Sequence, residues 1–104
     1  MQSTSINIDE FVKNVARNLN RFTGKAEYIP TSRTIVTYSQ GQSLEAKIHL
    51  HNVPSADDIL YSIEIDNSEF VGPIHKLSTD DFQDHILCTV MSKLGDKVMN
   101  ALLK

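Results

Sequence analysis

The spacing of apolar residues changes twice along this chain, and these changes restrict the fold more than any other feature of the sequence. Apolar residues recur every three or four positions from residue 8 to residue 19, and again from residue 82 to residue 102. Between residues 26 and 74 they tend to alternate with polar residues. The first spacing is typical of helices and the second of strands. The sequence therefore predicts a helix, then a sheet, then a second helix.

Local motifs mark where both helices begin. Asn7 and Glu10 have the spacing of a capping box, in which each side chain accepts a hydrogen bond from a backbone N–H at the helix start. Ser78 and Asp81 repeat this motif before the second helix. Gly24 is suited to end the first helix, because glycine adopts the left-handed backbone of a helix stop without strain.

Three strands are predicted, at residues 33–38, 44–50 and 59–66. In the second strand, alternation places one row of side chains in a core and the other in solvent. Residues 39–42 have the composition of a hairpin loop that joins the first two strands. Ile35 and Val36 leave open which side of the first strand faces inward. The expected fold class is α+β, with two layers in the order helix, three or four antiparallel strands, helix.

A length of 104 residues fits one domain, and 40% apolar with 22% charged residues is ordinary for a globular chain. We expect residues 1–5 to be a flexible N-terminus and residues 6–104 to form a single domain. Cys88 is the only cysteine, so no intramolecular disulfide is available, which favours a reducing compartment. No secretion signal or membrane-spanning stretch is visible, and a cytoplasmic location is therefore expected.

The second helix has an apolar arc that covers roughly half of its circumference. We expect one sheet face not to cover all of it, and the uncovered part to form a homodimer interface. The interface candidates are Phe82, Ile86, Val90, Met91 and Leu94. Gly95 leaves two arrangements open, either one continuous helix or two helices with Asp96 capping the second.

Acidic residues concentrate in the second part of the chain. Residues 41–104 carry ten acidic residues against five lysines, whereas residues 1–40 carry five basic residues against three acidic ones. The sequence predicts an acidic patch that could bind a basic protein surface, formed by Asp57, Asp58, Glu64, Asp66 and Glu69. A set of ordinary solvated faces is the alternative.

Basic residues recur every four positions on the first predicted helix, at Lys13, Arg17 and Arg21. They lie opposite the apolar stripe, where they could contact phosphates or an acidic protein. The order of elements is similar to that of double-stranded-RNA-binding domains, in which lysines at the start of the second helix meet phosphates. Residues 79–84 of this chain instead include three aspartates, so the residues do not follow that family. Nucleic-acid binding stays an alternative function.

Two histidines lie two positions apart on a predicted strand and therefore project from the same face. His49 and His51 could hold a metal ion with a third ligand from Glu45, or from Glu64 if its strand is the neighbour. The alternative is a polar sheet face that carries histidines for no metal. Cys88 has the spacing to meet His85, but its place inside an apolar helix predicts a partly buried, unreactive thiol.

Sequence signatures of nucleotide-binding loops, zinc hydrolases, serine hydrolases and dithiol redox centres are missing from the chain. We therefore expect a small non-enzymatic protein-interaction module with no cofactor. In charge and size the chain resembles acidic binding proteins such as secretion chaperones, toxin-neutralising immunity proteins and phage-encoded inhibitors. A metal-dependent enzyme built on His49 and His51 is a second alternative, after nucleic-acid binding.

Overall fold

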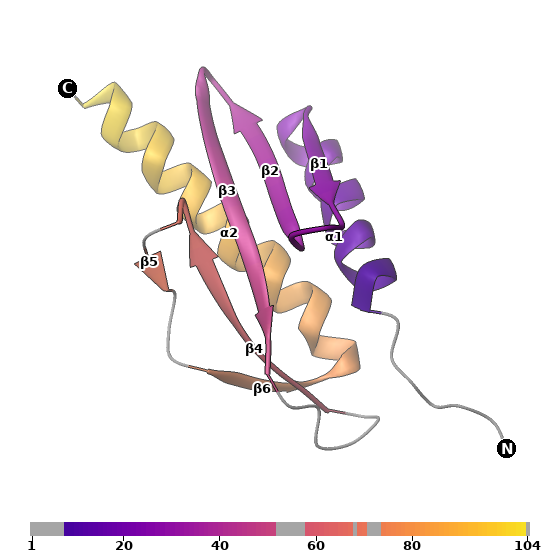
Figure 1. Ribbon diagram of the computed structural model, residues 1–104. Coiled ribbons are helices and arrows are strands. Elements are labelled where there is room, and N and C mark those ends of the chain that lie inside the picture. The colour runs from indigo at the N-terminus through magenta and orange to yellow at the C-terminus, as the bar shows by residue number, and fades with distance from the viewer. Residues whose placement is uncertain (1–7, 52–57, 68, 71–73, 104) are drawn as a thin grey trace, which may run out of the picture.

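In the described part of the chain, two helices flank six strands along the sequence (Figure 1). The computed structural model describes residues 8–51, 58–67, 69–70 and 74–103. The elements, in chain order, are α1 (Ile8–Thr23), β1 (Ala26–Ile29), β2 (Thr34–Ser39), β3 (Gln42–Leu50), β4 (Asp58–Ile65), β5 (Glu69–Phe70), β6 (His75–Ser78) and α2 (Thr79–Leu102).

The strands form one antiparallel sheet with the order β1-β2-β3-β4, and both β5 and β6 pair with β4. The α+β class, the antiparallel pairing and the two enclosing helices are confirmed. The expected number of strands was too low, because β1, β5 and β6 were not predicted. These strands have four residues or fewer. Strands this short show too little alternation to be distinguished from loops.

The predicted hairpin loop is confirmed between β2 and β3. Gln40 and Gly41 have φ of 49° and 81°, as in the two-residue turns that match strand twist. The pairing of Ile35 with Ala46 resolves which face of β2 points inward. Ile35 and Ala46 are both fully buried, whereas Val36 belongs to the opposite face.

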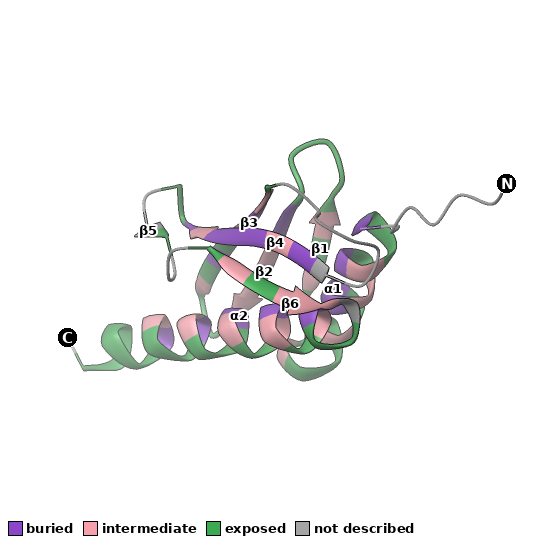
Figure 2. Cartoon of the chain, turned by 90° about the horizontal axis from the view of Figure 1, so that it is seen from below, coloured by how far each residue is buried: buried purple, intermediate pink, exposed green. Residues whose placement is uncertain are grey.

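Both helices pack on the same face of the sheet, and Figure 2 shows the sheet above the helix layer. α1 contacts β1, β2 and α2, while α2 contacts β2, β3, β4 and β6. The core between the layers includes Val12, Leu19, Ile35, Ile48, Ile63 and Ile86. No described helix covers the opposite sheet face, which carries the polar residues of β3 and β4.

The second helix is continuous through Gly95, which settles the two arrangements that the sequence left open. Its predicted N-cap is confirmed, because the Asp81 N–H donates to Ser78 Oγ at 3.3 Å. Asn7 lies outside the described residues, so the first capping box stays a prediction. The C-terminal turns of α2 are exposed and project beyond the sheet (Figure 2). Neither described helix has the length and apolar content needed to span a membrane.

The proposed dimer residues require a correction. Phe82, Ile86 and Val90 are fully buried in the core of the single chain, and Leu94 is also buried. These four side chains face the sheet and α1, so they present no surface to a second copy. Met91 alone among the five candidates is exposed, with 37% of its surface accessible. The apolar arc of α2 is thus divided between the core and a separate outer stripe.

Candidate interaction surfaces

An uncharged stripe runs along the outer side of α2 from Cys88 to Leu102, while the exposed Asp81 and Asp84 continue the same line toward the start of the helix. With about 100° of rotation per residue, its members fall within an arc of about 80° on the helix surface. All of them are exposed, and Met99 and Leu102 expose 56% and 66% of their surface. We call this stripe the α2 outer face, and it consists of Cys88, Met91, Gly95, Met99 and Leu102.

Beside this face lies a hollow of about 270 Å³. One wall is formed by α2, and the other by the end of α1 and the β2–β3 turn. The lining residues are Thr23, Ser39, Gln40, Met91, Leu94, Gly95, Val98 and Met99. Phe22 precedes the lining residue Thr23 and exposes 66% of its surface, while Leu103 exposes 78%. Large apolar side chains are therefore exposed at the C-terminal ends of both α1 and α2. The sequence signal for this surface was the width of the apolar arc.

The predicted acidic patch is described only in part. Asp57 lies outside the described residues, as do the side chains of Asp58 and Glu69. Glu64 and Asp66, the other two members, each bond within the chain. Glu64 Oε1 lies 2.7 Å from His49 Nε2, and Asp66 Oδ2 accepts from Lys97 Nζ at 2.8 Å.

Asp66 joins α2 to the turn after β4. Its other carboxylate oxygen accepts from the Glu45 N–H at 3.0 Å, and Lys97 also donates to the Ser43 carbonyl. Burial by itself raises the pKa of Asp66, but the bonds from Lys97 and Glu45 outweigh burial and lower it. Asp66 and Lys97 line a second hollow of about 300 Å³. This carboxylate therefore helps to hold α2 against the end of β4, and its place in an acidic binding patch stays a prediction.

The basic residues of α1 are exposed, as predicted from their spacing. Lys13, Arg17 and Arg21 lie on the side of α1 that faces away from the core. Arg17 Nη1 donates to Asn14 Oδ1 at 2.8 Å. Lys25 Nζ lies 4.8 Å from the centre of the Tyr38 ring, where it makes a cation–π contact. The side chains of Lys13, Arg17 and Arg21 thus share one exposed face of α1.

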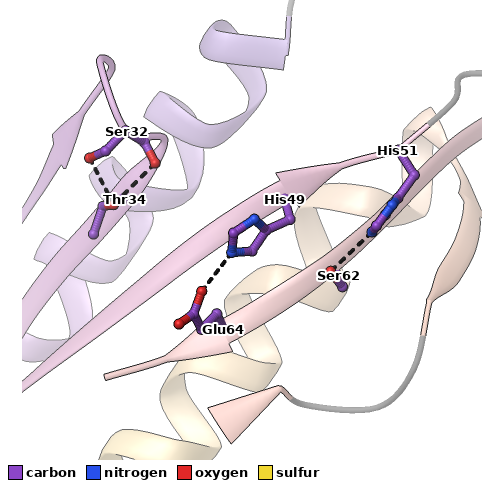
Figure 3. Close-up of polar contacts among 6 residues, drawn as sticks. All are labelled: Ser32, Thr34, His49, His51, Ser62 and Glu64. Atoms are coloured by element: carbon purple, nitrogen blue, oxygen red, sulfur yellow. Dashed lines mark hydrogen bonds and ion pairs between the residues drawn. The ribbon is translucent and has the colours of Figure 1, made fainter. Parts of the chain in front are cut away.

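The two candidate metal-binding histidines do not converge on one point. Glu64 lies beside His49, as expected if β3 and β4 are neighbours, but the nearest partner of His51 is Ser62 Oγ at 3.1 Å from Nε2 (Figure 3). Phe70 packs against the His49 ring, with 5.5 Å between the ring centres. Among the described residues, no three His, Cys, Asp or Glu side chains lie close enough to hold a metal ion. Glu45 is therefore not a third ligand.

A cluster of aromatic and imidazole rings that the sequence did not indicate lies between β4, β6 and α2. Tyr61 is fully buried, and its hydroxyl makes a short hydrogen bond to His85 Nδ1. The ring centre of His75 lies 4.3 Å from that of His85, and Phe82 packs edge-on against Tyr61. Burial raises the pKa of Tyr61. Burial first, and then the charge of His75, lowers the pKa of His85. Both shifts favour the uncharged forms, so a protonated hydroxyl and a neutral imidazole share this hydrogen bond.

Cys88 differs from its predicted environment. The thiol is exposed rather than partly buried, because residue 88 lies on the outer side of α2. His85, its expected partner, bonds to Tyr61 instead. Nothing in this arrangement assembles a nucleophile with its base.

Comparison with known proteins gives no relative for this chain: no family model, no curated protein and no solved structure matches it. Function must therefore be argued from the surfaces described above.

Proposed function

We propose that this chain is a protein-interaction module that acts by binding rather than by catalysis, and that its binding surface is the α2 outer face. The observation that carries the proposal is the exposure of Met99 and Leu102 beside a hollow with an apolar floor. Exposed apolar area of this kind, without charged residues, is typical of interface centres.

Three of the four histidines have a role in holding the fold together. His49, His51 and His85 each bond to a neighbouring side chain of the same chain. Tyr61, which bonds His85, is fully buried and therefore not presented to a substrate. A general base must have a nitrogen within hydrogen-bond reach of a substrate proton. These three side chains are better accounted for as contacts that stabilise the sheet and its contact with α2.

Nucleic-acid binding is the second candidate, and the exposed face of Lys13, Arg17 and Arg21 is the observation that favours it. Such a face could neutralise backbone phosphates, and the affinity would then fall steeply as salt rises. Nucleic-acid binding is less well supported than protein binding, because the chain has more acidic than basic residues and a formal net charge of −3.

The test compares two matched variants in affinity capture from a native lysate, with and without nuclease. Met99→Lys places a charge on the α2 outer face, whereas Ile74→Lys places one at a side chain of similar exposure elsewhere, 52% against 56%. We expect Met99→Lys to reduce recovery of a protein partner roughly tenfold or more, and Ile74→Lys to leave it unchanged.

Two results would contradict the proposal. Equal recovery with both variants would mean that the α2 outer face does not bind the partner. Recovery that disappears after nuclease treatment would move the basic face of α1 to first place. In that case Arg17→Ala, and not Met99→Lys, would weaken binding.

A further inference from the structure

We infer that the occupant of the α2 outer face is a second copy of this chain, whose α2 packs antiparallel to the first with the two helices crossing at Gly95. This inference rests on the proposed function, because it names the partner of the same face. It also replaces the four buried dimer candidates with an interface on the opposite side of the helix.

The first argument is the symmetry of the face about one residue. Met91 and Met99 lie four positions on either side of Gly95, and Cys88 and Leu102 lie seven positions on either side. A twofold axis through Gly95 therefore places Met91 of one copy against Met99 of the other, and Cys88 against Leu102. Each contact occurs twice, as an interface between identical surfaces requires.

The second argument is the glycine itself. Glycine weakens a helix interior, so its presence there needs a reason. Gly95 does not have a positive φ, and a Cβ added to it would meet no atom within 4 Å. Nothing in the single chain requires glycine at this position. A second helix crossing here does, because a residue without a side chain lets two helix axes approach closely.

The third argument is area. The exposed parts of Met91, Met99 and Leu102 amount to about 300 Å² per copy, taking roughly 200 Å² for a large apolar side chain. Leu103, which follows the face along the chain, and Phe22, which precedes the hollow residue Thr23, would add about as much. With these flanking residues included, two copies would bury about 1,200 Å² of apolar surface, the lower end of the range of specific dimers. Lys93, Asp96 and Lys97 line the second hollow, away from the outer face, so no like charges need to meet across the axis.

The experiment uses the full chain and the native Cys88. Two Cys88 thiols in the antiparallel pair would be about 21 Å apart along the helices, too far for a disulfide. Leu102→Cys puts a new thiol opposite Cys88 of the other copy. A mild added oxidant accepts the two electrons and two protons of each thiol pair, and with it this variant should form a covalent dimer. The two thiols come within reach of each other when the helices cross at a shallow angle. Cys88→Ser combined with Leu102→Cys should not, and neither should Asn100→Cys, whose thiol lies at the second hollow.

Sedimentation equilibrium of the unmodified chain completes the test. A dimer that Met99→Lys converts to monomer, together with crosslinking that needs both thiols, supports the inference. A monomer throughout the tens-of-micromolar range overturns it, as does crosslinking of Leu102→Cys that persists without Cys88. If the chain is a monomer and Met99→Lys still loses a captured protein, the inference fails while the proposed function stands.

Discussion

At the scale of single residues, the contact between Tyr61 and His85 shows how burial fixes the state of a titratable group. Tyr61 Oη and Nδ1 of His85 share one hydrogen bond, and burial lowers the pKa of His85, so the neutral imidazole is favoured. Three groups face one another here, with Tyr61 from β4, His75 from β6 and His85 from α2. Protonation of His85 would place a charge beside a buried hydroxyl and close to His75.

This contact makes the stability of the fold depend on pH. The pKa of His85 is lowered from 6.5 in the folded chain, so the unfolded chain binds more protons just below that pH. The contribution of His85 is therefore complete above pH 6.5 and is lost as the pH falls from there toward the folded pKa. We expect the urea midpoint to decrease between about pH 7 and about pH 5. The urea midpoint of His85→Gln, whose side chain does not titrate, should decrease less over the same pH range. If the midpoint of this variant depends on pH as steeply as that of the unmodified chain, the assignment to His85 is refuted.

Sequence reasoning found the residues that act locally and missed those that act across the fold. Ser78 and Gly41 were predicted because caps and tight turns are specified by a few neighbouring residues. The contact of Tyr61 with His85 joins positions 24 apart, and that of Asp66 with Lys97 joins positions 31 apart. Such pairs depend on strand register and on how α2 lies across the sheet, neither of which is encoded in local spacing.

At the scale of elements, α2 is the helix whose apolar pattern could not be interpreted without the sheet. Its arc is wider than one contact surface, as expected, but four of the five residues assigned to the interface are buried in the single chain. Phe82, Ile86, Val90 and Leu94 form the buried side, and Met91, Met99 and Leu102 form the exposed side. Both rows have helical spacing and similar apolarity, so the sequence alone does not show which row meets β3 and β4.

Replacing Gly95 should change the stability of the single chain and the stability of the dimer in opposite directions. Gly95→Ala should stabilise the single chain by about 0.5–1 kcal/mol, because alanine favours a helix interior and the added Cβ meets open space. The same Cβ lies at the proposed crossing and should weaken the dimer. The gain in stability of the single chain is measured by urea unfolding of Gly95→Ala combined with Met99→Lys, because Met99→Lys is expected to prevent dimerisation. The loss of dimer affinity is measured as the dissociation constant of Gly95→Ala alone. A variant that gains stability with unchanged dimerisation would place the crossing elsewhere on α2.

At the scale of the whole molecule, one sheet divides the chain into two environments. On one side the helices bury the apolar rows of β3 and β4, and on the other side His49, His51 and Glu64 remain on the sheet surface. The outer side of α2 gives a third surface, with the last turns of the helix beyond the sheet (Figure 2). A dimer through α2 would leave the polar sheet face and the basic face of α1 in each copy accessible to other molecules.

Hydrogen exchange of α2 tests the central claim most directly, because the C-terminal turns have little cover in the single chain. We would compare the amides of residues 99–103 in the unmodified chain, Met99→Lys and Ile74→Lys, all at one high concentration. The account predicts slow exchange in the unmodified chain and in Ile74→Lys, and fast exchange in Met99→Lys, while residues 82–94 stay protected by the core in all three. Equally fast exchange of residues 99–103 in the three proteins would contradict it, since the outer face would then be uncovered in solution.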